Sequence, residues 1–142
     1  MHRSWASMWG VLLALLGLTA AGLIMSACVE RGEQLSEADR QRLAPFLSRE
    51  APSPEHRLDV RFGSQVRLLG YDLSAASASP GDTVTVTWYW KCEGDLENGW
   101  RLFTHVATGE GENVLNQDGV GLVRELYHPE RWQQGQYIKD VQ

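Results

Sequence analysis

Three features of the 142-residue sequence predict an all-β fold. From residue 58 onward, apolar and polar side chains alternate with a period of two, as in strands with one buried face. Pro, Gly and Asn turn signals separate these short runs, and no helical period lies between them. Hydrophobic residues make up 43% of the chain, enough for a core. We therefore expect an antiparallel, immunoglobulin-like sandwich, complete or lacking strands, over residues 58–142, after an N-terminal signal or anchor helix and a short helical stalk.

Residues 1–27 have the composition of a secretory signal peptide. His2 and Arg3 form a short positive start, and the run over 11–18 is apolar and rich in leucine. No charged residue occurs over 4–29, which is also long enough for an uncleaved transmembrane helix. The charges that follow are mixed in sign rather than a basic stop-transfer cluster, so the sequence favours a cleaved signal.

The last residues of this segment, Met25-Ser26-Ala27-Cys28, resemble the lipobox of bacterial lipoproteins. In that family the cysteine is diacylated and becomes the mature N-terminus, and Leu is preferred where Met25 stands. The resemblance implies lipidation of Cys28 and anchoring in a membrane of the cell envelope, facing the periplasm or the surface. Acyl chains contribute about 0.8 kcal/mol per buried methylene, so two or more anchor firmly. Alternatively, Cys28 could form a disulfide with Cys92.

Residues 28–57 are expected to form a tether. Ser36-Glu37-Ala38-Asp39 fits a capping box, which predicts one short helix ending before Pro45. Pro52 and Pro54 predict an extended linker before the folded domain. The helix would have a small apolar face that docks on the domain or binds a partner, made by Leu43, Phe46 and Leu47.

Six strands are predicted, over residues 58–62, 66–73, 83–90, 100–108, 114–116 and 137–141. Gly70 interrupts the second and suggests a bulge or close packing. Ser79-Pro80-Gly81-Asp82 is a strong turn signal before the third. Cys92 is expected as a small apolar residue at a strand end. The residues expected on the inner faces are Leu68, Val84, Val86, Trp88, Leu102 and Val106.

The strand pattern carries a further likeness. The motifs that carry it are Leu-Leu-Gly-Tyr-Asp-Leu at 68–73, Pro-Gly-Asp at 80–82, Trp-Tyr-Trp at 88–90, Phe-Thr-His-Val at 103–106, and Trp132, Gly135 and Asp140. They resemble a periplasmic or extracellular β-sandwich domain that is appended to bacterial membrane glycosyltransferases and also occurs in lipoproteins. The resemblance implies an accessory module without an active site. It also implies further strands after Asp140, so a chain that stops at Gln142 is expected to expose a strand edge and part of its apolar face.

No catalytic, cofactor or metal site is predicted. The sequence lacks a phosphate-binding glycine motif, a metal-spaced Cys or His cluster and a nucleophile elbow. His105 is expected to be a half-buried structural histidine, and His128 to belong to a turn rather than to a metal site with Glu125 and Glu130. Beyond residue 27 the chain holds 12 basic and 18 acidic groups, a formal charge of −6, which argues against nucleic-acid binding.

Aromatic residues provide the remaining functional hypothesis. Trp88, Trp90 and Trp100 are expected in the core, whereas Tyr89 and Trp132 are the candidates for exposed sugar-stacking contacts. The sequence therefore favours a lipid-anchored envelope protein, not an enzyme, with a structural or interaction module. The alternative is a carbohydrate-binding module of an envelope glycan pathway. Expected partners are the membrane and an envelope protein or glycan.

Overall fold

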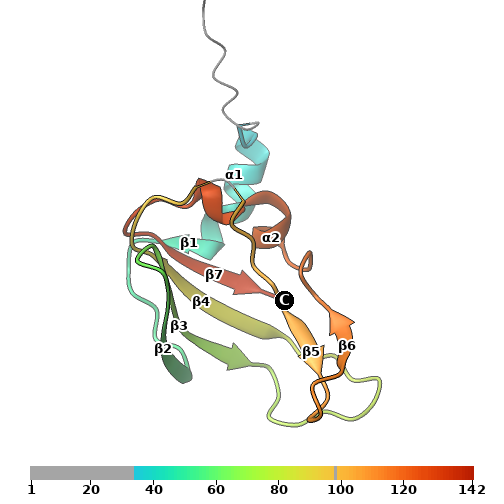
Figure 1. Cartoon of the computed structure of the whole chain (residues 1–142). Coiled ribbons are helices and arrows are strands. Elements are labelled where there is room, and N and C mark those ends of the chain that lie inside the picture. The colour runs from blue at the N-terminus through green and yellow to red at the C-terminus, as the bar shows by residue number, and fades with distance from the viewer. Residues whose placement is uncertain (1–33, 98) are drawn as a thin grey trace, which may run out of the picture. The chain divides into compact units, whose positions relative to one another are not determined.

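The computed structural model describes residues 34–97 and 99–142 (Figure 1). These residues are mostly β, with few helices, as predicted. A five-stranded antiparallel sheet has the order β1-β7-β4-β3-β2, and β5 and β6 form a separate two-stranded sheet. The strands are β1 Leu47–Ser48, β2 His56–Phe62, β3 Val66–Leu73, β4 Val86–Cys92, β5 His105–Ala107, β6 Asn113–Asn116 and β7 Tyr137–Val141. This architecture is consistent with an all-β sandwich.

One face of the larger sheet carries the core. Alternation along β4 places Trp90 and Cys92 on the same face, and both are buried. The register sets Leu68 of β3 and Ile138 of β7 on either side of Trp90. The buried core comprises Leu43, Val66, Leu68, Trp90, Cys92, Val123, Tyr127, Trp132 and Ile138. Cys92 is the last residue of β4, which confirms the role predicted for it.

The bulge predicted at Gly70 is present. The register of β3 against β4 shifts between Leu68 and Gly70. Gly70 has φ +155°, and a Cβ at this position would collide with the carbonyl oxygen of His56 on β2. A residue without a side chain is therefore required where β2 and β3 approach each other.

The segment predicted as a tether contributes to the folded domain. Helix α1 spans Glu37–Leu43, and the Ser36 hydroxyl caps it by accepting a hydrogen bond from the Asp39 backbone N–H at 3.1 Å. Leu43 is fully buried in the core. After the 3₁₀ turn η1 (Ala44–Phe46), β1 pairs with β7 through Leu47 and Ser48. The helix and its docking face were predicted correctly, but residues 34–57 are not a stalk outside the core.

Two other expectations need correction. The strand predicted over 100–108 is reduced to β5, and Val106 is 48% exposed rather than in the core. A short helix, α2 (Leu122–Leu126), and a 3₁₀ turn, η2 (Pro129–Arg131), occur where no helix was expected. Val123 is buried and Leu122 and Leu126 pack against the core, which favours α2 in the fold. The helix was missed because five residues are too few to show a helical period in the sequence.

Residues 1–27 and Cys28, where a signal peptide and a lipidation site are predicted, lie outside the described residues. Within the described ranges, no helix is long and apolar enough to cross a membrane.

Candidate functional site

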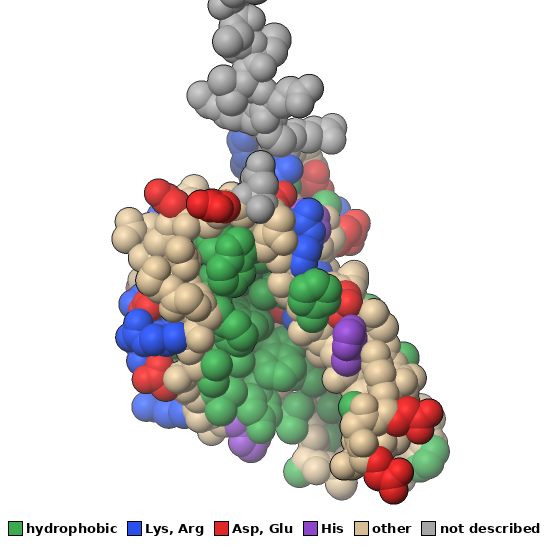
Figure 2. All heavy atoms as spheres, in the orientation of Figure 1, with side chains coloured by type: hydrophobic (Ala, Val, Ile, Leu, Met, Phe, Trp, Pro, Cys, Tyr) green, Lys and Arg blue, Asp and Glu red, His purple; other side chains and the backbone are tan. Residues whose placement is uncertain are grey.

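An apolar hollow lies over the face of the larger sheet that carries the core. Figure 2 shows the hydrophobic side chains gathered there in one continuous area. The aromatic hollow, as we name it, has a volume of about 220 Å³. It is lined by Phe62, Val66, Trp90, Trp100, Arg101, Leu102, Phe103, Pro129 and Trp132. Phe62 and Trp132 flank Trp90, with ring centroids 5.8 Å and 6.3 Å away.

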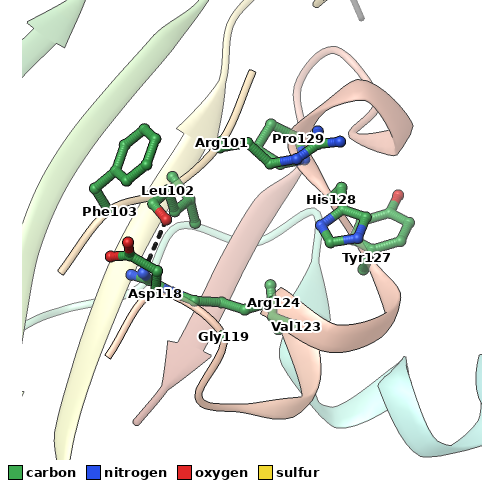
Figure 3. Close-up of a pocket in the computed structure, with 10 residues that line it drawn as sticks. All are labelled: Arg101, Leu102, Phe103, Asp118, Gly119, Val123, Arg124, Tyr127, His128 and Pro129. Carbon is green, nitrogen blue, oxygen red and sulfur yellow. Dashed lines mark hydrogen bonds between the residues drawn. The ribbon is translucent and has the colours of Figure 1, made fainter. Parts of the chain in front are cut away.

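A second cavity adjoins the first. The Arg124 pocket, shown in Figure 3, has a volume of about 250 Å³ and shares Arg101, Leu102, Phe103 and Pro129 with the aromatic hollow. The segment 101–103 therefore forms a wall common to both cavities. Phe103 is the most exposed part of this wall, with 72% of its surface accessible. Its ring thus offers an apolar contact to a molecule that approaches from solvent.

A buried ion pair holds the wall in place. Arg124 of α2 donates from Nε to Asp140 Oδ2 of β7 at 2.9 Å, and its Nη2 lies 2.9 Å from the same oxygen. The Arg124 and Asp140 side chains are only 2% and 0% exposed. The third contact of the guanidinium, from Nη1 to the Leu102 carbonyl at 3.2 Å, is the dashed line in Figure 3. One side chain therefore connects the helix, the sheet and the wall.

The pair sits in an environment that disfavours charge. Burial raises the pKa of Asp140, and the hydrogen bonds and charge of Arg124 oppose that rise only in part. Asp140 Oδ1 and the indole Nε1 of Trp90 are both buried, and neither has a hydrogen-bond partner among the described residues. Trp90 nevertheless lies close enough to favour the ionised carboxylate slightly. Without Arg124, the buried Asp140 carboxylate would lose its charge partner, so the stability of the fold here depends on that residue.

Asp118 closes the rim of the Arg124 pocket. Its Oδ1 accepts the backbone N–H of Thr104 at 2.7 Å, and its Oδ2 lies 3.3 Å from His105 Nε2 and 3.1 Å from Asn116 Nδ2. The Thr104 N–H, followed by the side-chain bonds, lowers the pKa of Asp118. His105 therefore has a structural partner, although it is more exposed than the half-buried position predicted for it.

Arg101 on the common wall is also engaged. Its Nη1 lies 2.7 Å from Glu130 Oε2 of η2, and the hydrogen bond from Arg101 lowers the pKa of Glu130. The charged groups around the cavities therefore already have partners within the domain. In the described part of the chain, no group of three or more His, Cys, Asp or Glu side chains is arranged to hold a metal ion.

The two predicted sugar contacts are not brought together. Tyr89 lies on the opposite face of β4 from Trp90, where it lines a separate hollow of about 250 Å³ with Tyr137. Its hydroxyl donates to Asp72 Oδ2 at 2.6 Å, and burial together with this bond raises the Tyr89 pKa to about 12. Trp132 is only 5% exposed and donates its indole N–H to the Tyr127 carbonyl at 3.0 Å. It is a core residue, and the expectation of an exposed ring was wrong.

Sequence reasoning missed the residues that form the actual cavities. Phe103 had a usable signal, because alternation already placed it on the face opposite Trp100 and Leu102. Asp140 had one too, because it shares a strand face with the buried Ile138. Arg124 carried no comparable signal, since its burial depends on α2.

No family model matches this chain, and comparison with curated proteins and with solved structures likewise found no match.

Proposed function

We propose that this chain is a lipid-anchored protein of the cell envelope whose β-rich domain is a noncatalytic interaction module. Residues 1–27 would direct export, and Cys28 would carry the lipid that holds the protein at the membrane. The domain would be an immunoglobulin-like sandwich akin to the module appended to membrane glycosyltransferases. The antiparallel strands and the separate β5–β6 sheet support this finer assignment.

The exposed wall between the two cavities carries the proposal. It combines Phe103, which is 72% exposed, with apolar cavities on both sides. Contact surfaces of this kind gain affinity from aromatic anchors and from backbone that is already ordered. Arg124 supplies that order through its bond to the Leu102 carbonyl.

The electrostatics of the cavities favour binding over catalysis. A general acid or base needs a proton-transfer group that can reach a substrate with a pKa near the working pH. The Asp118 carboxylate is instead held by the Thr104 N–H, which lowers its pKa. Arg101 and Arg124 are each occupied by an internal carboxylate. Side chains held by internal partners are better suited to positioning a bound molecule than to transferring protons in catalysis.

The anchor is tested by growing cells that express the full chain with an alkyne-tagged fatty acid. We expect the label on the parent chain and on Cys92→Ser, the matched control, and its loss from Cys28→Ser. Cys92 is buried at the end of β4, so acylation there is not expected. Label that persists on Cys28→Ser, or a parent chain without label, would contradict lipid anchoring.

The interaction module is tested by placing a photo-crosslinking amino acid at Phe103 in intact cells. The matched control carries the same amino acid at Val114, which is also exposed but lies on β6. We expect a discrete adduct from position 103 only, and its loss when Arg124 is also replaced by Met. Equal labelling from both positions would show that the wall has no special role.

A carbohydrate-binding module is the second candidate. The exposed ring of Phe103, instead of the buried Trp132, would then stack against the sugar. Sugars stack on exposed aromatic rings that are flanked by polar groups, and Arg101 and Asp118 line the same pocket as Phe103. Titration with cell-wall and capsular glycans should then change the tryptophan fluorescence, because Trp90 and Trp100 line the adjoining hollow. The change should disappear in Phe103→Ser, and a silent parent chain would reject this candidate.

A further inference from the structure

Strand β2 forms one edge of the larger sheet and is open to solvent. Among the described residues it stands last in the strand order and pairs only with β3, and every residue from His56 to Phe62 is exposed. Its apolar residues Leu58, Val60 and Phe62 are among the large exposed hydrophobic residues of the domain. Unpaired backbone groups beside apolar side chains form a template for adding another strand.

The charges of β2 indicate which strand could pair with its free edge. The sequence over 57–61 is Arg-Leu-Asp-Val-Arg. When two copies are aligned antiparallel about Val60, Asp59 of each copy faces the partner's Arg61. The two Val60 side chains then face each other, on the side of the sheet that also carries Phe62. Opposite charges and apolar pairs directly across two strands both stabilise a sheet.

The neighbouring register is unfavourable. Alignment about Asp59 would place the two Asp59 carboxylates opposite each other and Arg57 opposite the partner's Arg61. Like charges in directly opposed positions destabilise a strand pair. The order of charges therefore distinguishes one symmetric register from the next.

We propose that β2 is a self-association edge, which pairs antiparallel with β2 of a second copy in the register centred on Val60. The two five-stranded sheets would then become one continuous sheet, and the apolar faces beside Phe62 would adjoin.

The charged groups remain available for this pairing. Asp59 contacts Arg67 on β3, and Arg61 lies 3.3 Å from Glu93, yet their side chains are still 62% and 59% exposed. A partner's Arg61 beside Asp59 would extend the contacts that join Asp59 to Arg67 and Arg67 to Glu93. The internal contacts also hold Asp59 and Arg61 on the side of the sheet opposite Phe62.

The edge also contains a feature that limits affinity. A bulge lies between Arg57 and Val60, whereas Val60–Phe62 pair regularly with β3. Bulges increase twist and shorten the usable edge. About five residues from each copy would meet, which is less than a standard interface, so we expect a dissociation constant on the order of 10–100 µM.

The test measures association of the full chain by sedimentation velocity in density-matched detergent, over a hundredfold range of concentration. Arg61→Asp makes both positions acidic, and Asp59→Arg makes both basic, so each variant alone should dimerise on the order of tenfold more weakly than the parent. An equimolar mixture of the two restores an acidic residue opposite a basic residue at every position. The mixture should therefore form heterodimers with an affinity within about threefold of the parent.

Folding and specificity have separate controls. Arg40→Asp alters a comparable exposed ion pair on α1 and should leave the parent affinity unchanged. A circular dichroism spectrum like that of the parent shows that each variant is folded. A parent chain that stays monomeric, variants that still dimerise, or a mixture that stays monomeric would each overturn the proposal.

A chemical cross-link tests directly whether the two strands pair in the register centred on Val60. Val60→Cys places two thiols opposite each other at the symmetry axis, where the Cα separation of paired strands suits a disulfide. Mild oxidation should produce a covalent dimer well above the level given by the parent cysteines. Val114→Cys, at a still more exposed site on β6, should not produce such a dimer. Equal cross-linking of both variants would count against a β2 interface.

Discussion

The buried ion pair between α2 and β7 can be tested most sharply. Replacing Arg124 by Met leaves Asp140 without its charge partner at a position that is 0% exposed. Solvent screening is absent there, so the full cost of breaking a buried pair applies, about 3–5 kcal/mol of unfolding free energy. For a domain of this size, that loss lowers the melting temperature by about 10–20 °C. The double variant Arg124→Met/Asp140→Leu removes both charges and should regain most of the loss.

The same variant should acquire a distinctive pH dependence. Burial already raises the pKa of Asp140, and removing Arg124 raises it further. A carboxyl whose pKa is higher in the folded than in the unfolded chain contributes stability that is present below its unfolded pKa and lost as the pH rises through its folded pKa. Arg124→Met should therefore be relatively more stable near pH 4, close to the ordinary pKa of a free aspartate, than near pH 8.

Urea unfolding followed by tryptophan fluorescence measures both effects, because Trp90 lies beside Asp140 in the core. The double variant serves as the control, since it lacks the carboxyl and should lose the added pH dependence. A loss below about 1 kcal/mol in Arg124→Met, or a double variant as unstable as the single one, would refute this account of the pair.

Three further predictions concern other parts of the domain. Leu43→Ala should cost about 2–5 kcal/mol in urea unfolding, whereas an independent stalk would leave domain stability unchanged. Gly70→Ala should destabilise the β2–β3 pair, because the Cβ of the alanine would meet the His56 carbonyl. Amide hydrogen exchange should then be faster than in the parent, with a larger change in β2 than in β4. Tyr89 should ionise with a pKa of about 12 in an ultraviolet absorbance titration, and Asp72→Asn should lower that value while leaving part of the rise, which is due to burial.

Local patterns allowed a large part of the fold to be predicted. The alternation over 66–73 and 137–141 matched β3 and β7 residue for residue, since both strands bury one face and expose the other in part. The capping box located the start of α1 because that signal lies entirely within four neighbouring residues. Such features need no knowledge of distant partners.

The errors occurred where distant contacts override a local pattern. Residues 100–104 alternate like a strand, but the Thr104 N–H and the Leu102 carbonyl bond to the side chains of Asp118 and Arg124 instead of to a neighbouring strand. Trp132 appeared to lie in a loop, and its burial against Trp90 depends on the preceding turn η2, whose Pro129 lines the same hollow over the sheet. The candidate cavities consist of these long-range contacts, so the sequence indicated Phe103 and Asp140 only weakly and Arg124 not at all.

If Cys28 carries a lipid, the burial of Leu43 limits how far the domain could stand from the bilayer. The spacer is then at most the eight-residue step from Cys28 to the cap residue Ser36. Fully extended, that step spans at most about 29 Å. The cavities and the β2 edge would then work within a thin layer above the lipid headgroups, where copies diffuse in two dimensions and meet often. A modest affinity between them would suffice in that layer.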